Sequence, residues 1–202
     1  MNAESYWQQS RQAVREKVVE TGMQLFLEHG FDATTTTQIA EEVGISSRSL
    51  FRYVATKEDL VLGHLEPQGE VVATALAARP DGEPPWDALR AALDSLRGPG
   101  YDEDHQLKLT KMIYASPSLR ARYMDKRMSW IELLAPEIAR RLHAAGAAGS
   151  VPEADLDLSA RAIVGTSLTC LTLAAEKWAA QDGKVDLGDL YDTAIAAVRG
   201  RE

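Results

Sequence analysis

Apolar residues recur at helical spacing along almost the whole chain, and glycine or proline interrupts them at intervals of about one helix length. From Ser10 to His29 the apolar positions fall near every third or fourth residue, and Gly30 follows as a C-terminal stop. No sustained alternation of apolar and polar residues occurs, and no Asn-Gly or Asp-Gly pair separates two β-branched runs. The sequence therefore predicts an all-α protein.

Two short helices joined by a glycine turn are predicted within residues 35–54. Thr35 and Gln38 have the spacing of a capping box, in which each side chain satisfies a backbone donor beside the other residue. This helix is expected to end at Gly44. Ser46 is expected to cap the next helix, which should extend through Val54.

The second of these helices carries basic side chains on one face. At 100° per residue, Leu50 and Val54 share one face, while Arg48 and Arg52 share the opposite one. A helix-turn-helix protein inserts its second helix into the DNA major groove, where the arginine fork can bond guanine O6 and N7 together. A solvated charged face would produce the same spacing, so the pattern alone leaves both explanations open.

Proline and cap residues predict how the chain continues. Thr56 should open a fourth helix that ends at Leu65, with Pro67 as its boundary. A long helix is expected to end at Ala145, and Pro136 should kink or divide it.

Two domains are expected: a DNA-binding domain over residues 1–65 and a larger helical domain over residues 66–202. In the larger domain, residues 155–180 are apolar on nearly every side. A helix of this kind must be buried on two sides, so one side should face its own domain and the other a partner subunit.

Composition limits the other classes of function. The net charge of −8 excludes a surface that binds nucleic acid everywhere, so any such contact must be local. Cys170 is the only cysteine, which excludes an internal disulfide and a cysteine-based zinc site and favours an inert buried thiol. No nucleophile elbow, phosphate-binding glycine loop or metal-spaced histidine pair occurs, so we expect no enzyme, cofactor or metal.

The N-terminal residues have neither the basic nor the apolar region of a secretory signal, and no run of eighteen apolar residues follows. The expected location is therefore the cytoplasm, with no membrane partner.

The stretch "VVETGMQLFLEHGFDATTTTQIAEEVGISSRSLFRYVATKEDLV" resembles the DNA-binding domain of the tetracycline-repressor (TetR) family. It contains the family's "LF-x-x-x-GF", "T-x-x-IA", "G-[VI]-S" and "K-E-x-L" landmarks. The resemblance implies phosphate contacts at Thr36, Phe51 and Lys57, and Thr37 lies at the same helix start, where a hydroxyl can also meet a phosphate. It implies that the base-reading residues are Ser47, Arg48, Ser49, Arg52 and Tyr53. Many family members have tyrosine in place of Phe51, so a hydrogen bond to phosphate is missing there.

The rest of the chain resembles the family in layout, with helices around an effector pocket and a last helix pair that forms a dimeric four-helix bundle. "SPSLRARYMDKRMSW" and "AAEKWAAQDG" are similar to the mycofactocin-system regulator, which implies acyl or acyl-CoA effectors. Effector pockets are mostly apolar with a few polar groups, although each such residue taken singly is more often core than ligand contact. The effector-binding candidates are His105, Leu109, Met112, Tyr123, Met128, Trp130, Thr166 and Cys170. The dimer-interface candidates are Leu168, Leu171, Trp178 and Leu190.

A basic row on the long helix has two explanations. Arg120, Arg122, Lys126 and Arg127 could meet an anionic headgroup, but a solvated basic face is the simpler interpretation.

The resulting expectation is a homodimeric repressor that binds a pseudo-palindromic double-stranded operator and is released by a small hydrophobic effector, acyl or aromatic. One alternative is a helical module whose basic row binds an acidic protein. Another is a DNA-binding regulator without a small-molecule effector.

Overall fold

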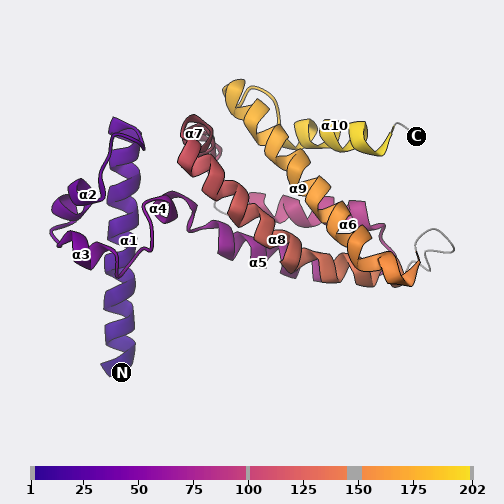
Figure 1. Cartoon of the computed structure of the whole chain (residues 1–202), viewed down its shortest axis with the longest axis horizontal. Helices are drawn as coiled ribbons and strands as arrows, with labels where there is room; N and C mark the ends of the chain where they lie inside the picture. The colour runs from indigo at the N-terminus through magenta and orange to yellow at the C-terminus, as the bar shows by residue number, and fades with distance from the viewer. Residues whose placement is uncertain (1–2, 99–100, 145–151, 201–202) are drawn as a thin grey trace. The chain divides into compact units, whose positions relative to one another are not determined.

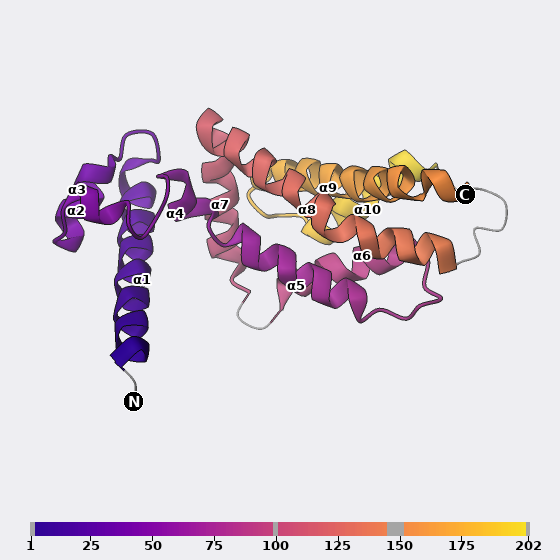
Figure 2. The ribbon, with the colours of Figure 1, turned by 60° about the horizontal axis from the view of Figure 1, so that its bottom comes forward.

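The computed structural model describes residues 3–98, 101–144 and 152–200, and every regular element in these ranges is a helix. The chain forms two compact units (Figures 1 and 2). The first contains residues up to 64 together with residues 112–122, and the second contains residues 65–111 and the chain from 123 onward. The predicted all-α class is therefore confirmed.

The first unit is built on α1 (Ala3–His29), which packs against α2 (Thr36–Val43) and α4 (Glu58–Leu62). Between α2 and α4 lies α3 (Ser47–Leu50). Burial of apolar side chains from all four helices forms the core, with Phe26, Ile39, Leu50 and Leu62 at most 2% exposed. A segment of 112–122, where α7 ends and α8 begins, completes the unit.

The second unit contains α5 (Leu65–Ala77), α6 (Pro85–Asp94), most of α7 (Glu103–Ala115), most of α8 (Pro117–Ala144), α9 (Leu156–Ala180) and α10 (Leu187–Arg199). Short 3-10 helices cover Ser95–Arg97 and Glu153–Asp155. α9 packs along α10, and α6 packs against α5 and α9 (Figure 2). Trp130, Leu134, Val164 and Trp178 belong to the apolar cluster at the centre of this unit.

By length and composition α9, with the residues just before it, could cross a membrane. Its buried face instead supplies much of the core of the second unit, where Val164, Leu168 and Ala174 pack in the apolar cluster. A core helix of a globular domain has the same composition, so the apolar character of α9 follows from its packing.

Several predicted helix boundaries are wrong. α1 begins at Ala3 rather than Ser10, and α3 ends at Leu50 rather than Val54. The fourth helix covers Glu58–Leu62 rather than residues 56–65. α5 then starts at Leu65 with Pro67 in its first turn, where the missing N–H of proline breaks no intrahelical bond.

Of the two expectations for Pro136, a kink or a division of the helix, the division is wrong, since one helix runs through this residue to Ala144. Pro136 is exposed, while Leu134, Ala135 and Ile138 around it are buried. Packing of that buried face stabilises the helix across the hydrogen bond that proline cannot make. The predicted end of this helix, Ala145, lies outside the described residues.

Candidate nucleic-acid interface

The turn between α2 and α3 has the local geometry that the sequence predicts. Thr35 and Gln38 form both hydrogen bonds of a capping box, which fixes the start of α2. Gly44 ends the helix with φ of 81°, a left-handed conformation that favours glycine. The Ser46 hydroxyl accepts a hydrogen bond from the Ser49 N–H at 3.1 Å and so caps α3.

Two buried side chains orient the residues that follow this cap. Leu50 is fully buried and Val54 is 5% exposed, although Val54 lies in the turn beyond the end of α3. Arg48 and Arg52, four residues apart, are both exposed. The predicted pattern of two buried apolar and two exposed basic side chains is therefore present, although Arg52 and Val54 lie beyond the end of the helix.

Most of the other DNA-contact candidates lie near these two arginines. The Ser47 hydroxyl is 3.5 Å from the Thr37 hydroxyl, which joins the first turns of α3 and α2. The Ser49 hydroxyl is 2.9 Å from that of Ser46 and so is engaged in the cap. The candidates on this surface have exposed or half-buried side chains: Thr36, Thr37, Ser47, Arg48, Ser49, Phe51, Arg52 and Tyr53.

Phe51 is the large apolar side chain of this surface, with 51% of its area exposed. An exposed phenylalanine is costly in water, but it can make apolar contact with a thymine methyl group or with the sugar backbone. Phe51 is therefore suited to an apolar contact with DNA rather than to a hydrogen bond.

Lys57 makes its contacts inside the first unit. Its ammonium group donates to the Phe31 carbonyl and lies 4.1 Å from the Phe31 ring centroid. Burial lowers the pKa of this lysine, against the opposing influence of Asp32 and Glu58. In this conformation the side chain fastens the start of α4 to the loop before α2, so its role as a phosphate contact stays a prediction.

Two arginines of α1 extend the surface and were not predicted as DNA contacts. Arg11 donates from Nη2 to the Arg52 carbonyl at 3.2 Å. A shallow cavity of about 200 Å³ lies there, lined by Arg11, Gln12, Arg15, Arg52 and Tyr53. The spacing of four between Arg11 and Arg15 predicts one shared helix face, but only the fold shows that this face lies beside the end of the recognition segment.

Positive charge is concentrated and uncompensated on this surface. Among the described residues, none of Arg11, Arg15, Arg48 and Arg52 lies within salt-bridge distance of a carboxylate, and all four are exposed. A group of unpaired guanidinium groups attracts phosphate, and the guanidinium fork can bind it in a bidentate manner. The geometry is therefore that of a helix-turn-helix surface with an added basic segment from α1.

The effector-binding candidates fall into three groups in the structure. Trp130 and Cys170 belong to the central apolar cluster of the second unit, and burial raises the pKa of the Cys170 thiol. His105 and Met128 are exposed, so their side chains do not join that cluster. The remaining candidates are buried (Leu109 and Tyr123) or half-buried (Met112 and Thr166), and Met112 belongs to the first unit.

The four dimer-interface candidates lie inside the protomer. Leu168, Leu171, Trp178 and Leu190 are at most 9% exposed and belong to the core cluster, so they leave little area for a partner. The apolar side chains that α9 and α10 do expose are Leu158, Leu173 and Val198, each more than half exposed.

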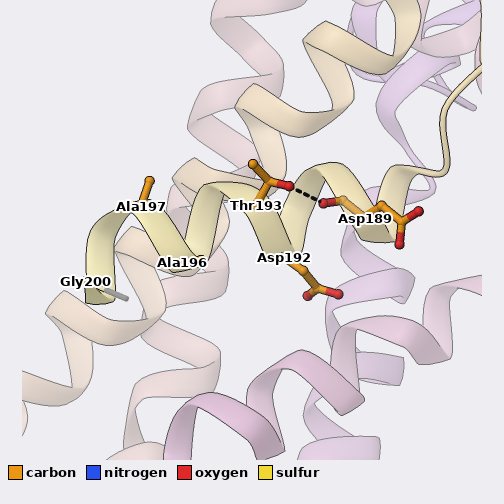
Figure 3. A pocket seen from close by; sticks show the side chains of 6 residues that line it. All are labelled: Asp189, Asp192, Thr193, Ala196, Ala197 and Gly200. Atoms are coloured by element: carbon orange, nitrogen blue, oxygen red, sulfur yellow. Dashed lines mark hydrogen bonds between the residues drawn. The ribbon is translucent and has the colours of Figure 1, made fainter. Parts of the chain in front are cut away.

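The exposed face of α10 also carries an open groove with short or acidic side chains (Figure 3). The Thr193 hydroxyl in this groove donates to the Asp189 carbonyl at 2.8 Å and so is turned back onto its own helix. The groove is lined by Asp189, Asp192, Thr193, Ala196, Ala197 and Gly200, and it offers no basic group to a nucleic acid.

Two family models match the chain. Residues 18–63 match the model of bacterial regulatory proteins of the tetR family, and residues 83–201 match the MftR C-terminal domain. The first match covers the helix-turn-helix surface, and the second covers most of the second unit.

Individual relatives agree with these models. The chain is 30% identical over 141 residues to the HTH-type transcriptional regulator TcmR of Streptomyces glaucescens, covering 66% of this chain and 62% of the relative. It is 31% identical over 127 residues to the putative mycofactocin biosynthesis transcriptional regulator MftR of Mycobacterium tuberculosis, covering 61% and 63%. The chain thus spans less than two thirds of the length of each of these curated relatives.

Solved structures share the fold over nearly the whole chain. The Thermus thermophilus repressor FadR, solved with lauroyl-CoA, has a TM-score of 0.56 and 26% identity, with 93% of this chain and 95% of that one covered. FadR from Bacillus subtilis, solved with stearoyl-CoA, has a TM-score of 0.57 and 14% identity, with 92% and 97% covered.

Proposed function

The chain belongs to the TetR family of bacterial regulatory proteins and has a C-terminal domain of the MftR type, and on this basis we propose that it is a homodimeric repressor. In this proposal a cytoplasmic dimer binds a pseudo-palindromic operator, and a small hydrophobic effector releases it. The observation that carries the DNA-binding part is the group of unpaired arginines on the helix-turn-helix surface.

The residues of that surface have separate roles in the proposal. Arg48 and Arg52 read base edges, where one bidentate contact to guanine is worth about 1–3 kcal/mol of discrimination. Thr36 and Thr37 bind phosphate at the start of α2, and Lys57 contributes when its side chain turns toward the backbone. Arg11 and Arg15 extend the phosphate contacts beyond the helix-turn-helix.

A dimer sets the spacing of the two recognition segments at about one DNA turn, roughly 34–36 Å. The exposed apolar side chains Leu158, Leu173 and Val198 support α9 and α10 as the interface, because a partner would remove them from water. Ala196 and Ala197 on α10, with Gly200 just after its end, allow a helix of the second copy to approach closely.

The acyl nature of the effector is supported by the Thermus thermophilus relative, which was solved with lauroyl-CoA. An effector acts as an inducer only if it binds the off-operator conformer better than the operator-bound one. A coupling free energy of about 1–3 kcal/mol would weaken operator binding by roughly 5- to 150-fold.

Contacts inside the first unit support a route for this coupling. The Ser116 hydroxyl donates to Asp32 at 2.8 Å, and the Ser118 hydroxyl donates to Glu58 at 3.2 Å. Ser116 and Ser118 lie at the junction of α7 and α8, and both helices continue into the second unit. A shift of this junction would therefore move Glu58, at the start of α4, together with the reading surface.

Selection of genome fragments with the purified protein, followed by salt titration of the best fragment, tests the proposal. We expect an enriched palindromic site whose affinity falls steeply with salt concentration, because phosphate contacts release counterions. The absence of any enriched fragment at low salt would contradict DNA binding. Unchanged operator affinity under saturating ligand would contradict the effector part alone.

A further inference from the structure

Arg127, on α8 in the second unit, is a buried cation without a counterion. Its side chain is only 9% exposed, and no carboxylate of the described residues lies within salt-bridge distance of it. The next residue toward the N-terminus, Lys126, is equally buried but donates to Glu66 at 3.0 Å. The expectation of a solvated basic face is therefore wrong for these two residues.

Aromatic side chains hold the Arg127 guanidinium in place. Nε donates to the Tyr123 hydroxyl at 3.0 Å, and the guanidinium lies 4.4 Å from the Trp130 ring centroid and 5.2 Å from that of Tyr123. Nη1 is buried and has no hydrogen-bond partner. The arrangement fixes the orientation of the group and leaves the N–H groups of Nη1 without an acceptor.

Trp130, on which the guanidinium lies, is itself fixed to α5. Its indole N–H donates to the Leu65 carbonyl at 3.2 Å. Gly69 packs so closely that a Cβ there would lie 2.9 Å from Trp130 Nε1, so the tryptophan has no room to shift toward α5. Trp130 also belongs to the central apolar cluster, so the Arg127 guanidinium lies at the edge of the apolar core of the second unit.

A second buried arginine of α8, Arg141, shows which hydrogen-bond acceptors this fold provides for a guanidinium that serves packing. Arg141 is 1% exposed, and each of its nitrogens donates a hydrogen bond. Nε donates to Glu137 at 2.9 Å, and the other two donate to backbone carbonyls of Leu76, Arg79 and Pro80 at 2.7–2.9 Å. Arg127 has neither a carboxylate nor a carbonyl partner, so its environment differs from that of an arginine that serves packing alone.

We propose that Arg127 binds an anionic oxygen group, a carboxylate or a phosphate, carried by the mainly apolar effector. The inference rests on the proposed function, because it assigns a chemical class to the effector of the same domain. An oxyanion would accept a charge-assisted hydrogen bond from Nη1 and compensate the buried charge. The aromatic rings would keep the guanidinium oriented before the ligand arrives, which lowers the entropic cost of binding.

Isothermal titration calorimetry of the full chain with three matched probes tests this assignment. The probes are decanoate, decanoyl-CoA and the neutral decan-1-ol. We expect at least one anionic probe to bind at least tenfold more tightly than the alcohol. Preference for decanoate indicates a carboxylate ligand, and binding of decanoyl-CoA alone indicates recognition of phosphate.

Two variants distinguish the contribution of Arg127 to anion binding from that of the overall positive charge of α8. Arg127→Gln should remove at least tenfold of the affinity for the preferred anion and leave binding of decan-1-ol unchanged. Arg140→Gln removes the same charge from an exposed, ion-paired position on the same helix and should change the anion affinity by less than about twofold.

A stability measurement serves as a control, because Arg127 and the structural arginine Arg141 should respond differently to substitution. Arg127→Met should retain or raise the melting temperature of the ligand-free protein. The change removes an uncompensated buried charge and replaces it with an apolar side chain of similar length. Loss of folding in both Arg127 variants, as for a structural arginine, would overturn the inference. Equal affinity for all three probes, no binding of either anion, or an unchanged anion preference in Arg127→Gln would overturn it too.

Operator binding is measured separately so that the two proposals can fail separately. If an anion binds through Arg127 but does not release DNA, the assignment of Arg127 stands and the inducer mechanism fails. If only neutral ligands release DNA, the repressor mechanism stands and the assignment of Arg127 is overturned.

Discussion

The two units treat their arginines differently. In the first unit, Arg11, Arg15, Arg48 and Arg52 are exposed and have no carboxylate partner among the described residues. In the second unit most arginines form ion pairs, which include Arg79–Glu83, Arg90–Asp192, Arg97–Asp186, Arg140–Asp81 and Arg161–Glu132. The chain has a net charge of −8, and yet no carboxylate of the described residues lies within salt-bridge distance of these four arginines.

The two groups of arginines differ in which negative groups lie near their positive charge. Within the second unit the carboxylates belong to the same chain, and Arg140 lowers the pKa of Glu137 by hydrogen bonding, with Arg141 adding to the effect. For the four exposed arginines of the first unit, the function proposed above assigns the role of negative partner to DNA phosphate. Substitutions of arginine should therefore change stability in one unit and DNA affinity in the other.

The largest effect is expected for Arg141→Gln in the second unit. The change removes one of the two arginine partners of Glu137 and the side-chain donor to the carbonyls of Leu76, Arg79 and Pro80. We expect the free energy of unfolding to fall by about 3–5 kcal/mol, measured by chemical denaturation. A loss below about 1 kcal/mol would contradict the structural role of this arginine.

The next largest effect is expected for Arg48→Ala in the first unit. It should relax sequence preference at one operator position at a cost of about 1–3 kcal/mol in binding, with the melting temperature almost unchanged. Binding to a set of single-base operator variants measures this. Equal weakening on every sequence would indicate that Arg48 contacts phosphate rather than a base.

Lys57→Ala should have a smaller and mixed effect. Loss of the hydrogen bond to the Phe31 carbonyl and of the contact with its ring should destabilise the first unit by about 1 kcal/mol. Binding to all DNA sequences should weaken alike, since a phosphate contact carries no sequence information. Unchanged stability together with weaker binding would show that the ammonium group faces DNA rather than Phe31.

The smallest effect is expected for Arg161→Gln, which breaks exposed pairs with Glu132 and Asp157. Such pairs contribute roughly 0–1 kcal/mol, so thermal unfolding should shift little. DNA affinity at constant salt should also stay within about twofold of the original. A large loss of DNA affinity would contradict the assignment of DNA binding to the arginines of the first unit alone.

Local signals predicted the helix caps and the turn between α2 and α3, because these features depend on single residues. The capping box of Thr35 and Gln38, the stop at Gly44 and the Ser46 cap all require particular side chains or backbone angles. The motifs in this region also predicted the family, which the family models confirm.

Features that depend on distant packing were not predictable in the same way. Arg11 lies beside Arg52 because α1 packs against a segment that is 41 residues further along the chain. The burial of Arg127 depends on α5, and Pro136 is tolerated because the buried face of α8 continues through it. The four interface candidates are apolar, a property that core and interface residues share, so the sequence alone does not separate the two.

The central claim is that the unpaired arginines of the first unit bind DNA phosphate or bases. Its most direct test is the salt dependence of operator affinity for the double variant Arg11→Gln, Arg15→Gln, compared with Arg140→Gln, Arg161→Gln in the second unit. Each lost phosphate contact should lower the slope of log affinity against log salt by about 0.9, so four contacts per dimer amount to about 3.6. The account predicts this change for the first pair and none for the second. Equal slopes for both double variants would contradict it.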